Sequence, residues 1–247
     1  MVLEKFRALG TPLDEAAPSP AGNSGDPRTF RELVERNRRV WGAKTAYQQK
    51  SRGNWQRVSH DDVYRRSYEM AAGFTALGLE PGDRIALIAE NGIEWALAYY
   101  GTVLAGCTSV PIYYELKPAE ITGMIERTEA RIVVVSAKVL PKLAEAGLAS
   151  VETIVVIGEA KTAPESAPSS MSRRHRPDVM SISDVPARAT PESRRKVAAT
   201  AVEPDDIASI VFTSGTTGGS KGVMLTHRNF MANLRSIRLA LAERERQ

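Results

Sequence analysis

The 247-residue sequence contains a single cysteine, Cys107, so no disulfide can form within the chain. A chain without disulfides is typical of a reducing compartment. Cys107 lies in the segment L-A-G-C-T-S-V-P, among apolar and small residues. This setting favours a buried core thiol over a reactive one.

Strong charge of either sign is also missing, because the formal net charge is only +4. A weakly basic balance tolerates an anionic substrate such as a nucleotide, but it gives no basis for DNA or RNA binding. The basic cluster Arg173–Arg176 has no aromatic residues interleaved with it. A solvated loop therefore explains it better than a nucleic-acid or anionic-lipid patch.

The N-terminus lacks the continuous apolar core of a signal peptide, and its acidic residues argue against a transit peptide. The segment Trp95–Tyr114 is uncharged over roughly twenty residues, about the span of a bilayer. Its pattern changes midway from helical to strand-like, which predicts a buried helix followed by a buried strand. We expect a cytoplasmic protein without a transmembrane segment, with peripheral membrane contact left open.

The first part of the chain consists of a segment of biased composition followed by segments with helix and hairpin patterns. Residues 1–27 are rich in Pro, Ala, Ser and Gly, which predicts no fixed structure. The helical segment T-F-R-E-L-V-E-R-N-R-R-V follows, and then a hairpin around R-G-N. Ser59 and Asp62 resemble a capping box that opens the next helix, and Gly78 is placed to end it in a left-handed conformation.

From Gly82 onward, short apolar segments alternate with helical ones. The strand-like segments R-I-A-L-I, C-T-S-V-P-I-Y, R-I-V-V-V-S and T-I-V-V-I-G are continuous apolar runs, as expected of parallel strands buried on both faces. This alternation predicts an α/β fold with a layered, mostly parallel sheet flanked by helices. Residues 160–202 interrupt it with Pro, Ser and charge, which predicts a long loop or a low-order insertion.

The chemistry-bearing segment is T-S-G-T-T-G-G-S-K-G, residues 213–222, which follows the apolar strand D-D-I-A-S-I-V-F. We expect a helix directly after it, from V-M-L-T-H-R-N onward. Backbone N–H groups at Gly215, Gly218 and Gly219 can approach phosphate oxygens. Lys221 supplies a point charge for the outer phosphates. Hydroxyl donors come from Thr213, Ser214, Thr216 and Thr217.

Two common nucleotide-binding patterns do not fit this segment. The P-loop requires Gly before the lysine and Ser or Thr after it, whereas Ser220 and Gly222 stand there. The dinucleotide pattern requires two glycines one residue apart, and Gly215 has no such neighbour. The remaining alternative to phosphate binding is a solvent-exposed loop rich in Gly and Thr.

The segment resembles the signature T-S-G-[ST]-T-G-x-P-K-G of the adenylate-forming (AMP-binding) superfamily, and departs from it only at Ser220, where the family usually has Pro. G-D-R-I-A-L-I-A-E-N-G-I-E-W upstream, V-P-I-Y, A-R-I-V-V-V-S and V-M-L-T-H-R-N resemble the long-chain fatty acyl-CoA synthetase branch. The residues Tyr114, Glu115 and Leu116 depart from that branch and leave the substrate class open. The resemblance covers about residue 28 to the end, weakly in 160–202.

This resemblance implies an enzyme that joins a fatty acid to the α-phosphate of ATP with Mg²⁺ and then transfers the acyl group to coenzyme A. It implies that Lys221 is the catalytic cation and that the loop hydroxyls hold the outer phosphates. It also implies that residues 28–247 are the N-terminal portion of the fold, which is incomplete here. The family's adenine, ribose, metal and C-terminal-domain residues have no counterpart in this sequence, so no metal ligand is assigned.

Three interpretations remain open at this point. The first is a long-chain acyl-CoA synthetase represented by its N-terminal region, with the rest of the enzyme supplied in trans. The second is an acyl-AMP ligase that passes the acyl group to a carrier protein. The third is a non-catalytic remnant or partner-binding module. His227, in T-H-R-N at an expected helix start, fits a capping or surface role better than a catalytic one.

Overall fold

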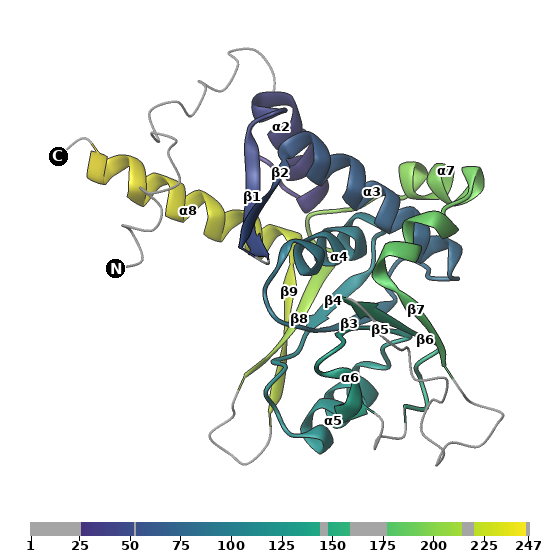
Figure 1. Cartoon of the computed structure of the whole chain (residues 1–247). Coiled ribbons are helices and arrows are strands. Elements are labelled where there is room, and N and C mark those ends of the chain that lie inside the picture. Colours follow the sequence, from purple (N-terminus) through teal and green to yellow (C-terminus); the bar gives the residue numbers. More distant parts are fainter. Residues whose placement is uncertain (1–25, 52, 144–147, 159–176, 214–219, 246–247) are drawn as a thin grey trace.

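The computed structural model describes residues 26–51, 53–143, 148–158, 177–213 and 220–245. Within these residues, seven strands form one sheet in the order β7-β6-β5-β3-β4-β8-β9, and β1 and β2 form a separate hairpin (Figure 1). The strands are β1 (Thr45–Ser51), β2 (Asn54–Ser59), β3 (Arg84–Ile88), β4 (Thr108–Pro111), β5 (Ile132–Ser136), β6 (Thr153–Ile157), β7 (Asp178–Ser181), β8 (Ile207–Thr213) and β9 (Lys221–Thr226). The α-helices are α2 (Phe30–Trp41), α3 (His60–Ala76), α4 (Ile93–Leu104), α5 (Pro118–Thr128), α6 (Leu140–Leu143), α7 (Pro191–Ala199) and α8 (His227–Glu245).

The centre of the large sheet is parallel. β3 pairs with β4 and β5, β5 pairs with β6, and β4 pairs with β8, all in the parallel sense. Only β9 is antiparallel to its neighbour, β8. The expected α/β fold with a mostly parallel sheet flanked by helices is therefore confirmed.

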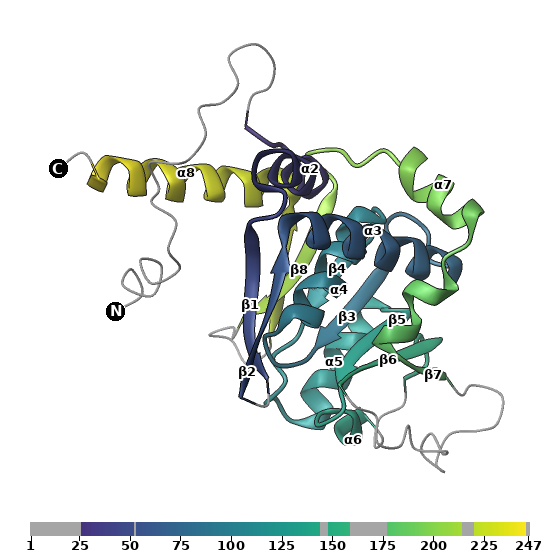
Figure 2. The ribbon, with the colours of Figure 1, turned by 45° about the horizontal axis from the view of Figure 1, so that its top comes forward.

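Helices cover both faces of this sheet (Figures 1 and 2). Alternate residues of each strand point to opposite faces, so Ile85 and Leu87 of β3 join the core under α3 and α4, where Phe74 and Val103 are also fully buried. Ala86 and Ile88 join the core under α5 on the other face. A strand buried on both faces needs apolar residues at every position, which explains the continuous runs in the sequence.

In the first half of the chain, the structure contains the local features that the sequence patterns predict. Ser59 Oγ accepts a hydrogen bond from the Asp62 backbone N–H at 3.1 Å, and Asp62 Oδ2 accepts one from the Ser59 N–H at 3.3 Å. This is the expected capping box at the start of α3. Gly78 follows α3 with φ +91°, in the left-handed region that favours glycine. The hairpin of β1 and β2 and the division of Trp95–Tyr114 into a helix and a strand are confirmed as well.

The expectation of a low-order segment over residues 160–202 is wrong for its second half. Residues 159–176, including the basic cluster, lie outside the described residues. After them, β7 adds to the sheet beside β6, and two short 3₁₀ helices, η2 (Ile182–Asp184) and η3 (Pro186–Arg188), lead into α7. Ile182, Val185 and Val197 are buried. Ile182 and Val185 have polar or proline neighbours, and Val197 is followed only by the small residues Ala198 and Ala199. Isolated large apolar positions of this kind give no periodic signal.

The helix expected directly after the phosphate-loop motif is replaced by a strand. Residues Lys221–Thr226 form β9, and α8 begins only at His227. Thr226 and Asn229 cap α8 reciprocally, because Asn229 Oδ1 accepts from the Thr226 N–H at 3.0 Å and Thr226 Oγ1 accepts from the Asn229 N–H at 3.3 Å. A helix that is capped at Thr226 cannot extend back to Val223.

The N-terminal end of the described chain lies beside α8. Asp26, which belongs to the segment expected to have no fixed structure, forms ion pairs with Arg235 and Arg238 at 3.3 and 2.6 Å. The expectation for residues 1–25 lies outside the described residues. Among the described helices, none is long and apolar enough to cross a membrane.

Candidate functional site

The candidate site lies at the turn end of the hairpin formed by β8 and β9. Thr213 and Lys221 are directly paired there, and paired residues of antiparallel strands place their side chains on the same face. Both side chains are exposed. The structure thus brings together the first hydroxyl and the lysine of the motif. The six predicted residues between them, Ser214, Gly215, Thr216, Thr217, Gly218 and Gly219, lie outside the described residues.

The site stands at the carboxyl edge of the sheet. β8 runs parallel to β4 and β3, so its C-terminal residue Thr213 leaves the sheet at the same edge as theirs. In open α/β sheets, ligands bind outside the carboxyl ends of the strands. A strand that ends in a loop rich in Gly, Ser and Thr at this edge has the position that a phosphate site requires.

Arg127 of α5 holds the stem of the hairpin and was not recognised from the sequence. Its Nη1 donates a hydrogen bond to the Ser220 carbonyl oxygen at 2.8 Å. Its guanidinium lies 5.3 Å from the centroid of the Phe212 ring. The contact joins residues 93 positions apart in the chain, and no local pattern around Arg127 indicates it.

The charge balance of the site suits an anionic ligand. Among the described residues, no carboxylate lies within ion-pair distance of the Lys221 ammonium. Nearby at this edge, Lys138 is already paired with Glu90 at 3.6 Å, and Lys142 donates to the Tyr114 and Leu116 carbonyl oxygens. An exposed ammonium beside a hydroxyl donor fits phosphate oxygens. The described residues contain no group of three or more His, Cys, Asp and Glu arranged to hold a metal ion.

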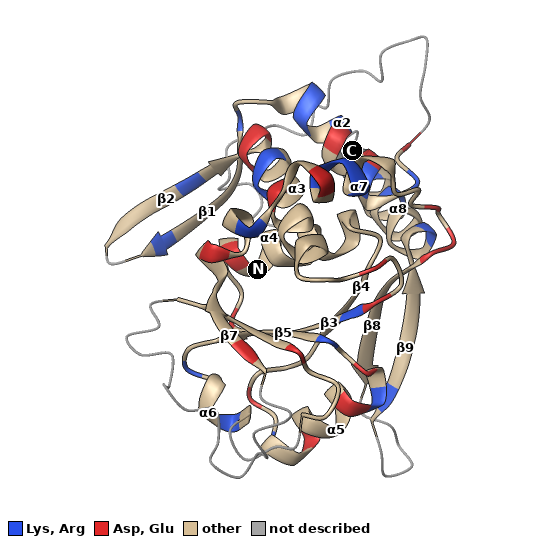
Figure 3. Cartoon of the chain, turned by 90° about the vertical axis from the view of Figure 1, so that its right-hand side faces the viewer, with Lys and Arg blue, Asp and Glu red and all other residues tan. Residues whose placement is uncertain are grey.

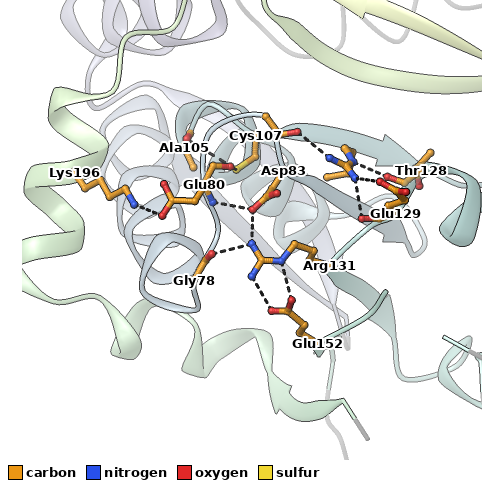
Figure 4. Close-up of polar contacts among 12 residues, drawn as sticks. Gly78, Glu80, Asp83, Ala105, Cys107, Thr128, Glu129, Arg131, Glu152 and Lys196 are labelled. Carbon is orange, nitrogen blue, oxygen red and sulfur yellow. Dashed lines mark hydrogen bonds and ion pairs between the residues drawn. The ribbon is translucent and has the colours of Figure 1, made fainter. Parts of the chain in front are cut away.

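At the opposite, amino edge of the sheet, the arginines are engaged in structural pairs (Figure 4). Arg131 binds Asp83 at 2.6 Å, Glu152 at 2.9 Å and the Gly78 carbonyl oxygen at 3.0 Å. Arg84 donates to the Thr128 carbonyl oxygen at 2.6 Å. These side chains join strands and helices, and their charge is already balanced.

Cys107, at the same edge, is a core residue as expected. It is 1% exposed, and its Sγ donates to the Glu80 carbonyl oxygen at 3.3 Å. Burial raises the pKa of the Cys107 thiol to about 12. A thiol that stays protonated at neutral pH is not a nucleophile.

His227 is neither a surface residue nor part of the phosphate site. Its side chain is 1% exposed, so the surface alternative is wrong. Nδ1 accepts a hydrogen bond at 3.2 Å from the backbone N–H of Phe30, the first residue of α2. Burial lowers the pKa of His227 to about 4, despite the nearby Asp206. A neutral imidazole therefore satisfies one of the free N–H groups at the start of α2.

Comparison with known proteins places the chain in a family. The model of the AMP-binding enzyme family matches residues 34–247. The chain is 31% identical over 174 residues to the 3-[(3aS,4S,7aS)-7a-methyl-1,5-dioxo-octahydro-1H-inden-4-yl]propanoyl:CoA ligase of Rhodococcus jostii, covering 70% of this chain and 33% of that protein. It is 30% identical over 209 residues to the long-chain-fatty-acid–CoA ligase ACSBG1 of Bos taurus, covering 83% and 28%.

A solved structure shows the same fold. The long-chain-fatty-acid-CoA ligase FadD1 from Archaeoglobus fulgidus superposes with a TM-score of 0.67 at 22% identity, over 89% of this chain and 41% of that one. The chain thus spans about a third of the length of the two curated relatives. The extent of the family match, which includes the whole phosphate-loop motif, shows that the chain belongs to the AMP-binding enzyme family.

Proposed function

We propose that the chain is the phosphate-binding part of an ATP-dependent acid–thiol ligase, which converts a fatty acid to its acyl adenylate and then to its coenzyme A thioester. The observation that carries this proposal is the pairing of Thr213 with Lys221 across the stem of the motif, both exposed at the carboxyl edge of the sheet. The family match supports the activity, and the chain matches about a third of the length of the two curated relatives.

The role of this chain in the reaction follows from the chemistry of the leaving group. ATP, bound with Mg²⁺, supplies the adenylyl group, and pyrophosphate leaves with additional negative charge. In this proposal the exposed Lys221 ammonium holds that charge, and the hydroxyls of Thr213, Ser214, Thr216 and Thr217 donate to the phosphate oxygens. Gly215, Gly218 and Gly219 let backbone N–H groups approach. A cation that binds the departing pyrophosphate more strongly than ATP lowers the barrier.

The fatty-acid substrate is the finer part of the proposal. The cattle relative is named for long-chain fatty acids, whereas the Rhodococcus relative is named for a propanoyl acid that carries a fused ring system. Both substrates are carboxylates attached to a large apolar group. We propose a long-chain fatty acid for this protein, a cytoplasmic location, and completion of the enzyme by a C-terminal portion acting in trans.

Binding of inorganic tripolyphosphate, followed by calorimetry, tests the phosphate site in the 247-residue chain itself. We expect Lys221→Ala to weaken binding by a factor of about 30 or more, because loss of one such donor costs about 2–4 kcal/mol. Arg195→Ala removes an exposed cation on α7 and is the matched control. Equal affinity of wild type and Lys221→Ala would reject the phosphate site, and with it the ligase assignment of this loop.

Substrate class requires a second measurement on the protein completed in trans with the C-terminal portion of a relative. ATP–pyrophosphate exchange is compared for palmitate and for a carboxylate on a fused ring system. Faster exchange with palmitate supports the fatty-acid assignment. Exchange with the ring-bearing acid alone would retain the ligase and replace its substrate.

A further inference from the structure

The hairpin of β1 and β2 has two different faces. On the inner face, Val58 is 2% exposed and packs beside Ile93 and Leu97 of α4. Tyr47 Oη lies 3.1 Å from Tyr100 Oη of the same helix. This face therefore fixes the hairpin to the body of the protein.

The outer face carries an exposed tryptophan between cations. Lys50 is paired directly with Trp55, and Gln48 is paired with Arg57, so these four side chains share one face. The Trp55 side chain is 58% exposed. Lys50 and Arg57 are exposed, and neither forms an ion pair with any described residue. The sequence of the hairpin, residues 45–59, contains no Asp or Glu (Figure 3).

This combination matches the chemistry of an anionic bilayer surface. Tryptophan partitions to the membrane–water interface, where its ring is apolar and its N–H reaches polar headgroups. Lysine and arginine near an anionic leaflet each contribute through attraction to lipid phosphates. The outer face of a two-stranded sheet presents all three side chains to one plane, as a bilayer surface requires, and it is not the concave pocket that a small ligand requires.

The hairpin is also held at the edge of the sheet that carries the candidate site. Gln49 Oε1 accepts a hydrogen bond at 2.9 Å from the backbone N–H of Ile93. Ile93 begins α4 just after the carboxyl end of β3. Lys50 and Trp55 extend past this contact toward the turn. The hairpin is therefore anchored beside the carboxyl end of β3, and its outer face shares no residue with the candidate site.

We propose that the outer face of the hairpin, formed by Lys50, Trp55 and Arg57, docks the protein onto anionic lipid bilayers. The docking depends on charge and on one aromatic ring, and it does not depend on ligase activity.

Vesicle flotation of the 247-residue chain tests this proposal directly. Vesicles of phosphatidylcholine alone are compared with vesicles of phosphatidylcholine mixed with phosphatidylglycerol. We expect binding only to the anionic vesicles, and weaker binding at about 0.5 M than at about 0.1 M salt, because salt screens exposed charges. The double variant Lys50→Glu with Arg57→Glu should reduce the partition coefficient by roughly thirtyfold or more.

A matched variant and a spectroscopic probe distinguish binding through this face from binding through the overall positive charge of the protein. Arg188→Glu with Arg195→Glu changes the net charge equally on η3 and α7, where both side chains are exposed, and it should bind like wild type. Brominated lipid should quench wild-type tryptophan fluorescence, and Trp55→Phe should lose that quenching while Trp41 and Trp95 remain. The proposal is overturned if both double variants bind equally, if neutral vesicles bind as well, or if quenching persists without Trp55.

Discussion

Arg127 is an exposed residue that acts on the candidate site from outside the motif. Its guanidinium holds the Ser220 carbonyl oxygen and covers the Phe212 ring. At Ser220 the family usually has Pro, which would stiffen the same point of the backbone. The hydrogen bond from Arg127 therefore restrains the stem of the loop in a chain that lacks that proline.

Replacing Arg127 with Ala should loosen the stem without unfolding the protein. An exposed hydrogen bond and a cation–π contact together contribute about 1–2 kcal/mol. We expect the hydrogen-bonded amides of β8 and β9 next to the loop to exchange with solvent about tenfold faster, as measured by hydrogen exchange, while amides of β5 are unchanged. Arg127→Lys keeps the charge but not the planar contact, so its amide exchange rates should lie between those of wild type and Arg127→Ala. Unchanged exchange in Arg127→Ala would show that the stem does not depend on this contact.

His227 makes the stability of the protein depend on pH. In the unfolded chain its imidazole binds a proton near pH 6.5, whereas in the folded chain the pKa is lowered to about 4. The unfolded state binds more protons between these values, so this contribution is complete above pH 6.5 and is lost as the pH falls toward 4. We expect the free energy of unfolding to fall by the order of 2–3 kcal/mol over that window.

The variant His227→Asn isolates this contribution. Its side-chain oxygen can still accept from the Phe30 N–H, but it does not titrate in this range. Urea unfolding at several pH values gives the free energy of unfolding. Between pH 4 and 6.5 this free energy should change less with pH in the variant than in wild type. His60, whose pKa is also lowered by burial, is replaced by Gln in both proteins to remove its own contribution. Parallel pH profiles of the two proteins would contradict the assignment to His227.

At the scale of elements, α3 lies unusually close to the segment between β7 and α7. A Cβ atom on Gly73 of α3 would lie 2.2 Å from the Val185 carbonyl oxygen. Gly123 of α5, in contrast, has nothing within 4 Å of such an atom. The two glycines therefore form a matched pair in which only the packing differs.

Gly73→Ala should destabilise the protein by about 1–3 kcal/mol or more, because the clash is with backbone and overpacking forces a shift. Gly123→Ala should be neutral or stabilising by up to about 1 kcal/mol, since alanine has the higher helix propensity. Chemical denaturation of both variants measures the difference. Equal stabilities would mean that residues 182–188 do not pack on α3 as the structure shows.

The same elements show what could be predicted from the sequence. The parallel strands and their helices were predictable because both faces are buried, so Ile132 and Val133 are apolar alike. The phosphate role of the motif stays a prediction, and the structure describes Thr213 and Lys221 of it as a pair across the hairpin. The strand β9 and the helix α7 were missed because a neighbouring strand or helix stabilises them. Arg127 and the buried acceptor His227 were missed because their partners are distant in the chain.

At the scale of the whole molecule, β9 and α8 each carry exposed large apolar side chains. β9 is the last strand of its sheet within the described residues, and α8 extends away from the body (Figure 2). Monomeric proteins rarely expose large apolar patches or long sheet edges without a partner. The large apolar side chains exposed here are Val223, Met224, Leu234, Ile237 and Leu239.

We therefore expect the isolated chain to self-associate and to bind a hydrophobic dye. Size exclusion with and without the C-terminal portion of a relative measures this, and a complex of the two should be monodisperse and dye-negative. Met224→Lys with Ile237→Lys should reduce dye binding of the isolated chain, because it replaces two of these exposed apolar side chains with charges. A monodisperse, dye-negative wild-type monomer would show that this surface needs no partner.

The order of strands in the sheet also determines when the protein can fold during its synthesis. β8 pairs with β4, and Ser209 Oγ donates to the Ser109 carbonyl oxygen across 100 positions of the chain. Ribosomes add about 5–20 residues per second, so the edge of β4 stays unpaired for roughly 5–20 s after it emerges. The N-terminal end of α2 stays without its acceptor for longer, because His227 is 197 positions away from Phe30. The nascent chain therefore offers the open edge of β4 to chaperones while about 100 further residues are synthesised.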